Sequence, residues 1–284
     1  MKKLFFLAIL FPFACFAQQA VNIIPQPVQI NLLQGNFIID KNTSLNFNNS
    51  NKDLLATANF LNHYINKISG IHLATNKTST NSIELKLIHT AQIGQEGYLL
   101  NVSSKAIIIS ANTKIGIVYG MQSLFQLLPA IRTNATLHVP CLSITDYPRF
   151  AYRGMHLDVS RHFFGPELVK EYIDLIAAYK MNTFHWHLVD DQGWRIEIKK
   201  YPSLTTTGAW RVDQNDKVWG SRPQAKPGEA TTYGGYYTQD QIKEIIKYAS
   251  DRNITIIPEI EMPGHVASAF ASYPYLSFTQ QPQL

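Results

Sequence analysis

Residues 152–191 constrain the fold of this chain more than any other stretch. They contain two short apolar segments separated by one amphipathic segment, and each apolar segment ends in charged and imidazole side chains. Short apolar runs predict buried strands, and apolar residues at helical spacing predict one face of a helix. We therefore expect a strand, a helix and a second strand, with functional groups where each strand ends.

The same alternation occurs once more downstream. Strands are predicted at residues 153–159, 182–188 and 254–260. One helix should begin at Gly165-Pro166, with proline in its first turn, and another at Thr238, where Gln241 completes a capping box. Strands that alternate with helices form parallel sheets, open or closed into a barrel. The residues expected to face inward are Leu168, Tyr172, Leu175, Ile176 and Tyr179 in the first helix, and Ile242, Ile245, Ile246 and Ala249 in the second.

Residues 20–146 show a different pattern. Helical spacing at 51–68, stopped by Gly70, and a second helix from Thr113 occur among several short strand signals. This mixture predicts a small α+β domain. It contains no cluster of ionisable groups, so we expect it to support a catalytic domain at 149–284.

The first 17 residues have the composition of a signal peptide. Lys2 and Lys3 precede an apolar run at 4–16 that is too short to span a bilayer, and cleavage after Ala17 is expected. A lipoprotein signal at Cys15 is the weaker alternative. The mature chain would therefore be exported, to the periplasm or the extracellular space, or to the lysosome in a eukaryote. No later run predicts a membrane span, and Cys141 would remain without a disulfide partner.

The net charge of +5 does not predict nucleic-acid binding, because basic and acidic residues are interleaved along the chain. The informative ionisable groups instead lie at the ends of the three predicted strands. Ligands bind at the carboxyl ends of strands in parallel α/β folds, so these groups form the predicted site. They are Asp158, Arg161 and His162 after the first strand, His185, His187, Asp190 and Asp191 around the second, and Glu259, Glu261 and His265 around the third.

Each of these groups has a structural alternative. Asp158 and Arg161 could form an ion pair that holds a loop. His185 and His187 point to the same side of a strand, where they are either core histidines or ligands of a divalent metal. The tryptophans of the long connection 189–237 (Trp194, Trp210 and Trp219) could anchor the loop or stack on sugar rings.

Three longer strings make the pattern recognisable. They are RGMHLDVSRH at 153–162, NTFHWHLVDDQGWR at 182–195 and PEIEMPGH at 258–265. In order and spacing they resemble the opening barrel strands of glycoside hydrolase family 20, the β-N-acetylhexosaminidases, and residues 20–146 are similar to the accessory domain of that family. The resemblance implies an α/β fold, a (β/α)8 TIM barrel preceded by a small α+β domain. Because about three βα units are present, it covers the N-terminal portion of such a protein.

The resemblance also implies a function. Family members remove terminal non-reducing N-acetylglucosamine or N-acetylgalactosamine from glycans or chitooligosaccharides by a retaining mechanism assisted by the acetamido group of the substrate. Arg161 would bind sugar hydroxyls, and Asp190 would hydrogen-bond His265, which faces the catalytic acid. Glu261 stands where many relatives carry Asp and has a supporting role. No cofactor and no metal are implied.

One expected element is missing from the chain. The family carries its acid Glu and acetamido-orienting Asp in a Gly-Gly-Asp-Glu-like string after the fourth strand, and no such string occurs here. We therefore expect these 284 residues alone to be inactive and prone to aggregation. The alternatives are a non-catalytic glycan-binding protein that retains Arg161, and a metal-dependent hydrolase that uses His185 and His187.

Overall fold

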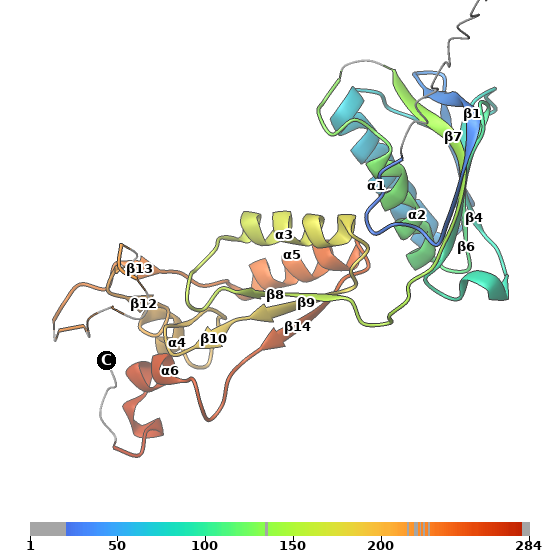
Figure 1. Cartoon of the computed structure of the whole chain (residues 1–284). Coiled ribbons are helices and arrows are strands. Elements are labelled where there is room, and N and C mark those ends of the chain that lie inside the picture. The colour runs from blue at the N-terminus through green and yellow to red at the C-terminus, as the bar shows by residue number, and fades with distance from the viewer. Residues whose placement is uncertain are drawn as a thin grey trace, which may run out of the picture.

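The computed structural model describes residues 21–133, 136–214, 216–218, 221, 223, 225–226 and 228–279. The expected signal peptide and Trp219 lie outside these residues. The chain forms two parts joined near residue 150, a large sheet with two helices on one face and a smaller parallel sheet with helices on one face (Figure 1). Within the described residues, the structure contains no helix with the length and apolar character that a membrane span requires.

The N-terminal part is built on a seven-stranded mixed sheet with the order β1-β7-β5-β6-β4-β2-β3. The strands β5 and β6 form an antiparallel hairpin, whereas β4 runs parallel to β6. The short 3-10 helix η1 (Ala91–Ile93) precedes β5. The strands are β1 (Gln29–Ile39), β2 (Ser44–Asn46), β3 (Ala74–Thr75), β4 (Ser82–Leu87), β5 (Tyr98–Val102), β6 (Ala106–Ala111) and β7 (Leu137–Asp146).

Two helices, α1 (Lys52–Ser69) and α2 (Lys114–Gln126), cover one face of this sheet (Figure 1). The Asn51 side chain accepts hydrogen bonds from the first turn of α1, and Gly70 ends the helix in a left-handed conformation with φ 73°. Helix α2 lies so close to the sheet that a Cβ at Gly120 would stand 2.5 Å from Ile109 Cγ2. This close contact helps to bury one continuous core between the sheet and the helices.

The C-terminal part contains the three predicted strands as a parallel sheet. They are β8 (Gly154–Asp158), β9 (Thr183–His187) and β14 (Thr255–Glu259), with β9 in the middle. Helices α3 (Pro166–Ala178) and α5 (Gln239–Ser250) pack on one face, and the predicted capping box of α5 is present. Helix α6 (Ala267–Ser272) and the 3-10 helix η3 (Pro274–Leu276) follow β14. The sequence therefore predicted the order and direction of these strands correctly.

The predicted inward faces of these two helices were partly wrong. Leu168, Leu175 and Tyr179 are exposed, and α3 instead buries Val169, Ile173 and Ala177 together with the correctly predicted Ile176. In α5, Ile245 and Ala249 are buried, but Ile246 is exposed. Helix α3 carries apolar residues over more than half a turn, so periodicity left its rotation open. Packing between α3, α5 and the sheet selects which series is buried.

The long connection 189–237 contains several short elements around the buried side chain of Arg195. The guanidinium donates to the carbonyl oxygens of Val159, Ser160, Ala209 and Gly235. Burial lowers the pKa of Arg195 to about 10, so the group stays charged at neutral pH. One side chain thus ties the turn after β8 to this connection. The elements are β10 (Val189–Asp190), β11 (Gly193–Trp194), α4 (Ser203–Thr206), β12 (Trp210–Arg211) and β13 (Tyr233–Gly234).

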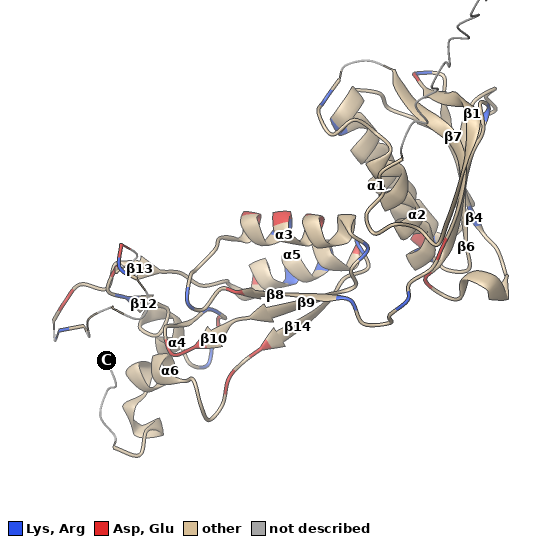
Figure 2. Cartoon of the chain, viewed as in Figure 1, with Lys and Arg blue, Asp and Glu red and all other residues tan. Residues whose placement is uncertain are grey.

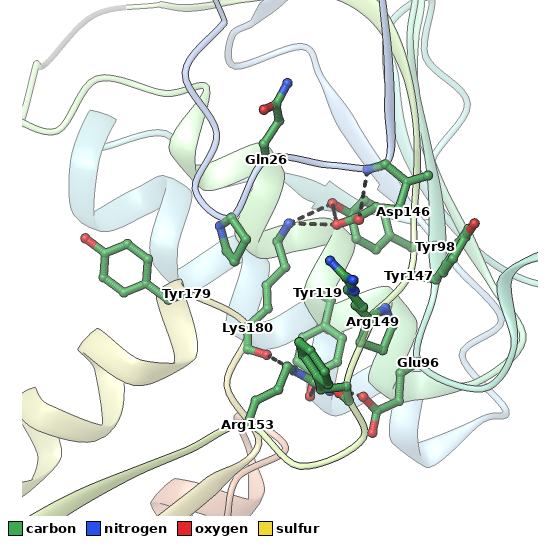
Figure 3. A pocket seen from close by; sticks show the side chains of 14 residues that line it. Gln26, Glu96, Tyr98, Tyr119, Asp146, Tyr147, Arg149, Arg153, Tyr179 and Lys180 are labelled. Atoms are coloured by element: carbon green, nitrogen blue, oxygen red, sulfur yellow. Dashed lines mark hydrogen bonds and ion pairs between the residues drawn. The ribbon is translucent and has the colours of Figure 1, made fainter.

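Partly buried ion pairs join the two parts at the amino end of β8 (Figure 3). Lys180 Nζ lies 2.9 Å from Asp146 Oδ2 and 3.0 Å from the Tyr98 hydroxyl. Arg153 Nη2 lies 2.7 Å from Glu96 Oε2. Burial lowers the pKa of Lys180, although Asp146 opposes this shift. The cavity between the parts, of about 360 Å³, is lined by these mutually paired groups, so its polar residues serve the junction.

The smaller sheet has helices on one face only. Among the described residues, β8 and β14 each pair with β9 and with no other strand. The apolar side chains of Met155 on β8 and Ile257 on β14 are exposed, as is Ile260 directly after β14. These exposed side chains and the single pairing of β14 leave apolar surface and a strand edge accessible in this part of the chain.

Candidate active site

The three predicted clusters meet at the carboxyl end of the parallel sheet. Asp158 and Glu259 are both paired in register with His187, one on each side of β9. Figure 2 shows acidic positions at the end of β14 and in the segment that follows it. Strand register therefore brings together residues that are up to about a hundred positions apart in the sequence.

Arg161 is held by ion pairs on two sides. Its Nη1 lies 2.7 Å from Asp158 Oδ2, its Nη2 lies 2.5 Å from Asp190 Oδ2, and its Nε donates to Gln192 Oε1 at 3.1 Å. Asp158 also accepts the backbone N–H groups of Ser160 and Arg161. Burial would raise the pKa of Asp158, but the hydrogen bonds and charge of Arg161 outweigh it and lower that pKa. The Asp158–Arg161 loop pair considered from the sequence is thus present, and it fixes the guanidinium.

Asp190 lies at the centre of the site and is only 1% exposed. Besides Arg161, its Oδ2 contacts His187 Nε2 at 3.1 Å, and its Oδ1 lies 3.4 Å from His265 Nδ1. His265 has φ 55°, in the left-handed region, and its imidazole is largely exposed. Its Nδ1 also lies 3.5 Å from Asp191 Oδ2. The structure therefore brings Asp190 and His265 together, and the roles assigned to Arg161, Asp190 and His265 stay predictions.

Glu259 faces the histidines of β9. Its Oε2 lies 2.5 Å from His185 Nε2 and 2.8 Å from His187 Nδ1. Burial would raise the pKa of Glu259, but the hydrogen bond from Glu261 and the two imidazoles together lower it. The same shared hydrogen bond raises the pKa of Glu261, because the protonated form of Glu261 is the donor. Glu261 thus contacts Glu259, which was not expected from the sequence.

The tryptophans of the connection are anchored by their indole nitrogens. Trp194 is buried and donates from Nε1 to the carbonyl of Ile196. Trp210 donates to the carbonyl of Thr205 and keeps part of its ring exposed. These contacts agree with the anchoring alternative for both residues.

Several residues of the site were missed from the sequence. His156 lies two residues before Asp158 on β8, so its side chain shares a face with Asp158, and its Nε2 lies 3.5 Å from His187 Nδ1. Because residues two apart on a strand share a face, the sequence could have indicated that His156 lies beside Asp158. Gln192 and Tyr233 had no such signal, because only the tertiary structure places Gln192 against Arg161 and the Tyr233 hydroxyl 3.3 Å from His162 Nδ1.

The two histidines of β9 differ in the possible metal ligands around them. His156, His187 and Glu259 present ligand atoms within 4.8 Å of one another, and so do Asp190, Asp191 and His265. His185 belongs to neither group of the described residues and contacts Glu259 instead. Both histidines contact Glu259 Oε2, and the metal-dependent alternative that uses His185 and His187 stays a prediction.

Two family models match almost the whole chain beyond the first 19 residues. Residues 20–147 match the model described as "Glycosyl hydrolase family 20, domain 2", and residues 150–284 match "Glycosyl hydrolase family 20, catalytic domain". A β-hexosaminidase of Porphyromonas gingivalis is 39% identical over 267 residues, which are 91% of this chain and 32% of the relative. The chain thus spans about a third of that relative's length.

Solved structures show the same likeness. The GH20 β-N-acetylhexosaminidase of Streptomyces coelicolor A3(2) matches with a TM-score of 0.80 and 32% identity, over 92% of this chain and 50% of that one. The GH20 exo-β-N-acetylglucosaminidase of Vibrio harveyi, solved with N-acetylglucosamine, matches with a TM-score of 0.76 and 36% identity, over 89% and 38%. The predicted fold class, part of a TIM barrel preceded by a smaller domain, is confirmed by these neighbours.

Proposed function

Because the chain belongs to glycoside hydrolase family 20, we propose that the full-length protein carrying it is a β-N-acetylhexosaminidase. It would remove terminal non-reducing N-acetylglucosamine or N-acetylgalactosamine from glycans or chitooligosaccharides. The observation that supports this most is the arrangement of Arg161, Asp190 and His265 at the carboxyl ends of the strands. Relatives named β-hexosaminidase and N,N'-diacetylchitobiase agree with this substrate class.

Arg161 is suited to bind the hydroxyls of the terminal sugar. A guanidinium has five N–H groups in a rigid plane. Asp158, Asp190 and Gln192 accept from Nη1, Nη2 and Nε, which leaves one N–H on each terminal nitrogen. Two parallel donors at fixed positions match a pair of neighbouring sugar hydroxyls. The two carboxylates thus hold the guanidinium without using all of its donors.

The reaction we propose is the retaining, substrate-assisted one, in which the acetamido oxygen of the substrate attacks the anomeric carbon. Asp190 would orient the imidazole of His265, and His265 would tune the catalytic acid. The acid Glu and the acetamido-orienting Asp are not among these 284 residues. We therefore propose that this polypeptide alone does not hydrolyse glycosides.

The domain organisation and location are proposed from the sequence. We assign residues 1–17 to a signal peptide, 20–146 to an α+β accessory domain and 149–284 to part of the catalytic barrel. The apolar run behind Lys2 and Lys3 supports export to the periplasm or the extracellular space. The strands before residue 150 form one mixed sheet and β8, β9 and β14 form a separate parallel sheet, which supports the domain division.

The test compares the full-length protein with its Arg161→Ala variant on an aryl N-acetylglucosaminide. Hydrogen bonds to a charged group contribute about 1.5–3 kcal/mol, so kcat/KM should fall roughly 10- to 200-fold. Arg149→Ala, at the opposite end of β8 and stacked on Phe150, is the matched control and should leave the rate unchanged. Full activity of the Arg161→Ala variant, or release of p-nitrophenol by the purified 284-residue chain, would contradict these assignments.

A further inference from the structure

The face of the small sheet opposite its helices carries three ligand atoms, one from each strand. They are His156 Nε2 on β8, His187 Nδ1 on β9 and Glu259 Oε2 on β14, and all lie within 4.8 Å of one another. The register of the parallel strands explains the convergence. His187 is paired with Glu259, and His156 stands two residues before the other register partner of His187, so the three side chains share a face.

The separations suit a small divalent cation. His156 Nε2 lies 3.5 Å from His187 Nδ1 and 3.9 Å from Glu259 Oε2. Zinc–ligand bonds of about 2.0–2.2 Å in tetrahedral geometry place neighbouring ligand atoms about 3.4 Å apart. The third separation, between His187 Nδ1 and Glu259 Oε2, is shorter at 2.8 Å. A cation bound to both atoms would widen it towards about 3.4 Å.

The surroundings of the three atoms have the organisation that metal sites require. A ligating histidine almost always donates its second ring nitrogen to a carboxylate or carbonyl. His187 Nε2 lies 3.1 Å from Asp190 Oδ2, and this buried carboxylate is itself paired with Arg161 at 2.5 Å. An N–H at Nε2 leaves the lone pair of Nδ1 directed to the other two ligands. His185 Nε2 contacts Glu259 Oε2 and so orients the ligating carboxylate.

We propose that His156, His187 and Glu259 bind one divalent transition-metal ion, with zinc as the best fit. Two imidazole nitrogens and one carboxylate oxygen favour zinc over the hard cations magnesium and calcium, which prefer oxygen ligands. The ion would link β8, β9 and β14 on their open face and fix His187, and through it Asp190. This role is structural and does not rest on the proposed glycosidase activity.

Equilibrium dialysis of the 284-residue chain against zinc chloride at neutral pH tests the site. Dialysis measures bound ion whether or not the chain associates through its exposed apolar residues. We expect one zinc per chain and no comparable binding of magnesium. His156→Ala and Glu259→Gln should each abolish stoichiometric binding. Asp190→Asn, which changes the partner of His187 but none of the three ligands, should weaken binding about 10- to 100-fold.

His63→Ala is the matched control, since this exposed histidine lies on α1 in the other part of the molecule. It should bind zinc like the unaltered chain. Circular dichroism checks that every variant retains its secondary structure, and His156→Gln replaces His156→Ala if the latter unfolds. The proposal is overturned if the unaltered chain binds no zinc. It is also overturned if a folded His156 variant binds as well as the unaltered chain, or if His63→Ala loses the ion as well.

Discussion

Both sheets of this molecule have helices on one face, and they differ in what stands on the opposite face. The seven-stranded sheet and its helices bury a continuous core, in which Ile109 on β6 is 0% exposed. The three-stranded sheet has α3 and α5 on one face, while the other face leaves Ile257 on β14 43% exposed beside the histidines and Glu259. Parallel sheets are normally covered on both faces. Similar elements therefore give a self-sufficient core in one part and an open, functional face in the other.

This difference also locates the chemistry. In the N-terminal part, the largely buried carboxylate of Asp146 is paired across the junction with Lys180. In the C-terminal part the charged groups converge on one another at the strand ends, around Asp190 and Glu259. The clustered charged groups thus lie on the three-stranded sheet, whereas the seven-stranded sheet contributes a charged partner to the junction.

Producing the two parts as separate fragments should change folding and association more than any of the substitutions below. A fragment of residues 20–146 should remain monomeric and unfold cooperatively, because its core lies within its own elements. A fragment of residues 149–284 should lack a cooperative transition and associate, because Met155, Ile257 and Ile260 are exposed. Thermal melting by circular dichroism and size-exclusion chromatography measure both. A monomeric, cooperatively folding 149–284 fragment would break the comparison.

A pair of isoleucine substitutions sharpens the comparison within the intact chain. Ile109→Ala should lower the free energy of unfolding by about 4 kcal/mol, since removing a fully buried side chain leaves a cavity. Ile257→Ala, a matched change on an exposed strand position, should stay within about 0.5 kcal/mol. Urea unfolding measures both values. Equal losses of stability would show that the Ile257 side chain is packed as closely as that of Ile109.

The junction between the parts should respond to loss of a buried charge. Lys180→Met leaves the largely buried Asp146 carboxylate without its cation and should lower the free energy of unfolding by about 3 kcal/mol. Adding Asp146→Asn should recover part of that loss, because the uncompensated charge is then gone. A double-mutant cycle by urea unfolding separates the two contributions. Additive losses in the cycle would mean that the pair does not couple the two parts.

A smaller loss of stability than at the junction is expected at Asp158, and it should depend on pH. The folded-state pKa of this carboxyl lies below its ordinary 3.8, so its stabilising contribution is present above that pH and is lost as pH falls through the lowered pKa. Asp158→Asn keeps a carbonyl acceptor but removes the charge beside Arg161. It should lower the free energy of unfolding by about 1 kcal/mol at pH 7.

The difference between Asp158→Asn and the unaltered chain should shrink as pH falls below 3.8, because protonation neutralises the native carboxylate as well. Urea unfolding at pH 7 and near pH 3 provides the comparison. An unchanged difference at the lower pH would show that the ion pair with Arg161 does not stabilise the site.

Local chemistry explains why much of the fold was predictable. The Asn51 and Thr238 caps and the left-handed Gly70 are short-range features, and each occurs where the sequence indicated a helix end. Short apolar runs, which are also local features, placed Asp158 and Glu259 at strand ends. The rotation of α3 was not predictable, because Leu168 and Val169 are both apolar and only packing against α5 and the sheet decides which is buried.

The sequence by itself determined the elements, their order and the family, since these follow from short-range periodicity and from three long strings of residues. Only the tertiary structure decided which groups pair. Arg161 is bound by Asp158 and Asp190 together, Glu261 contacts Glu259, and His156 joins His187. These contacts depend on strand register and on the burial of Asp190, which are set by packing across the whole sheet. A one-dimensional pattern does not specify distances of a few ångströms between residues so far apart in the chain.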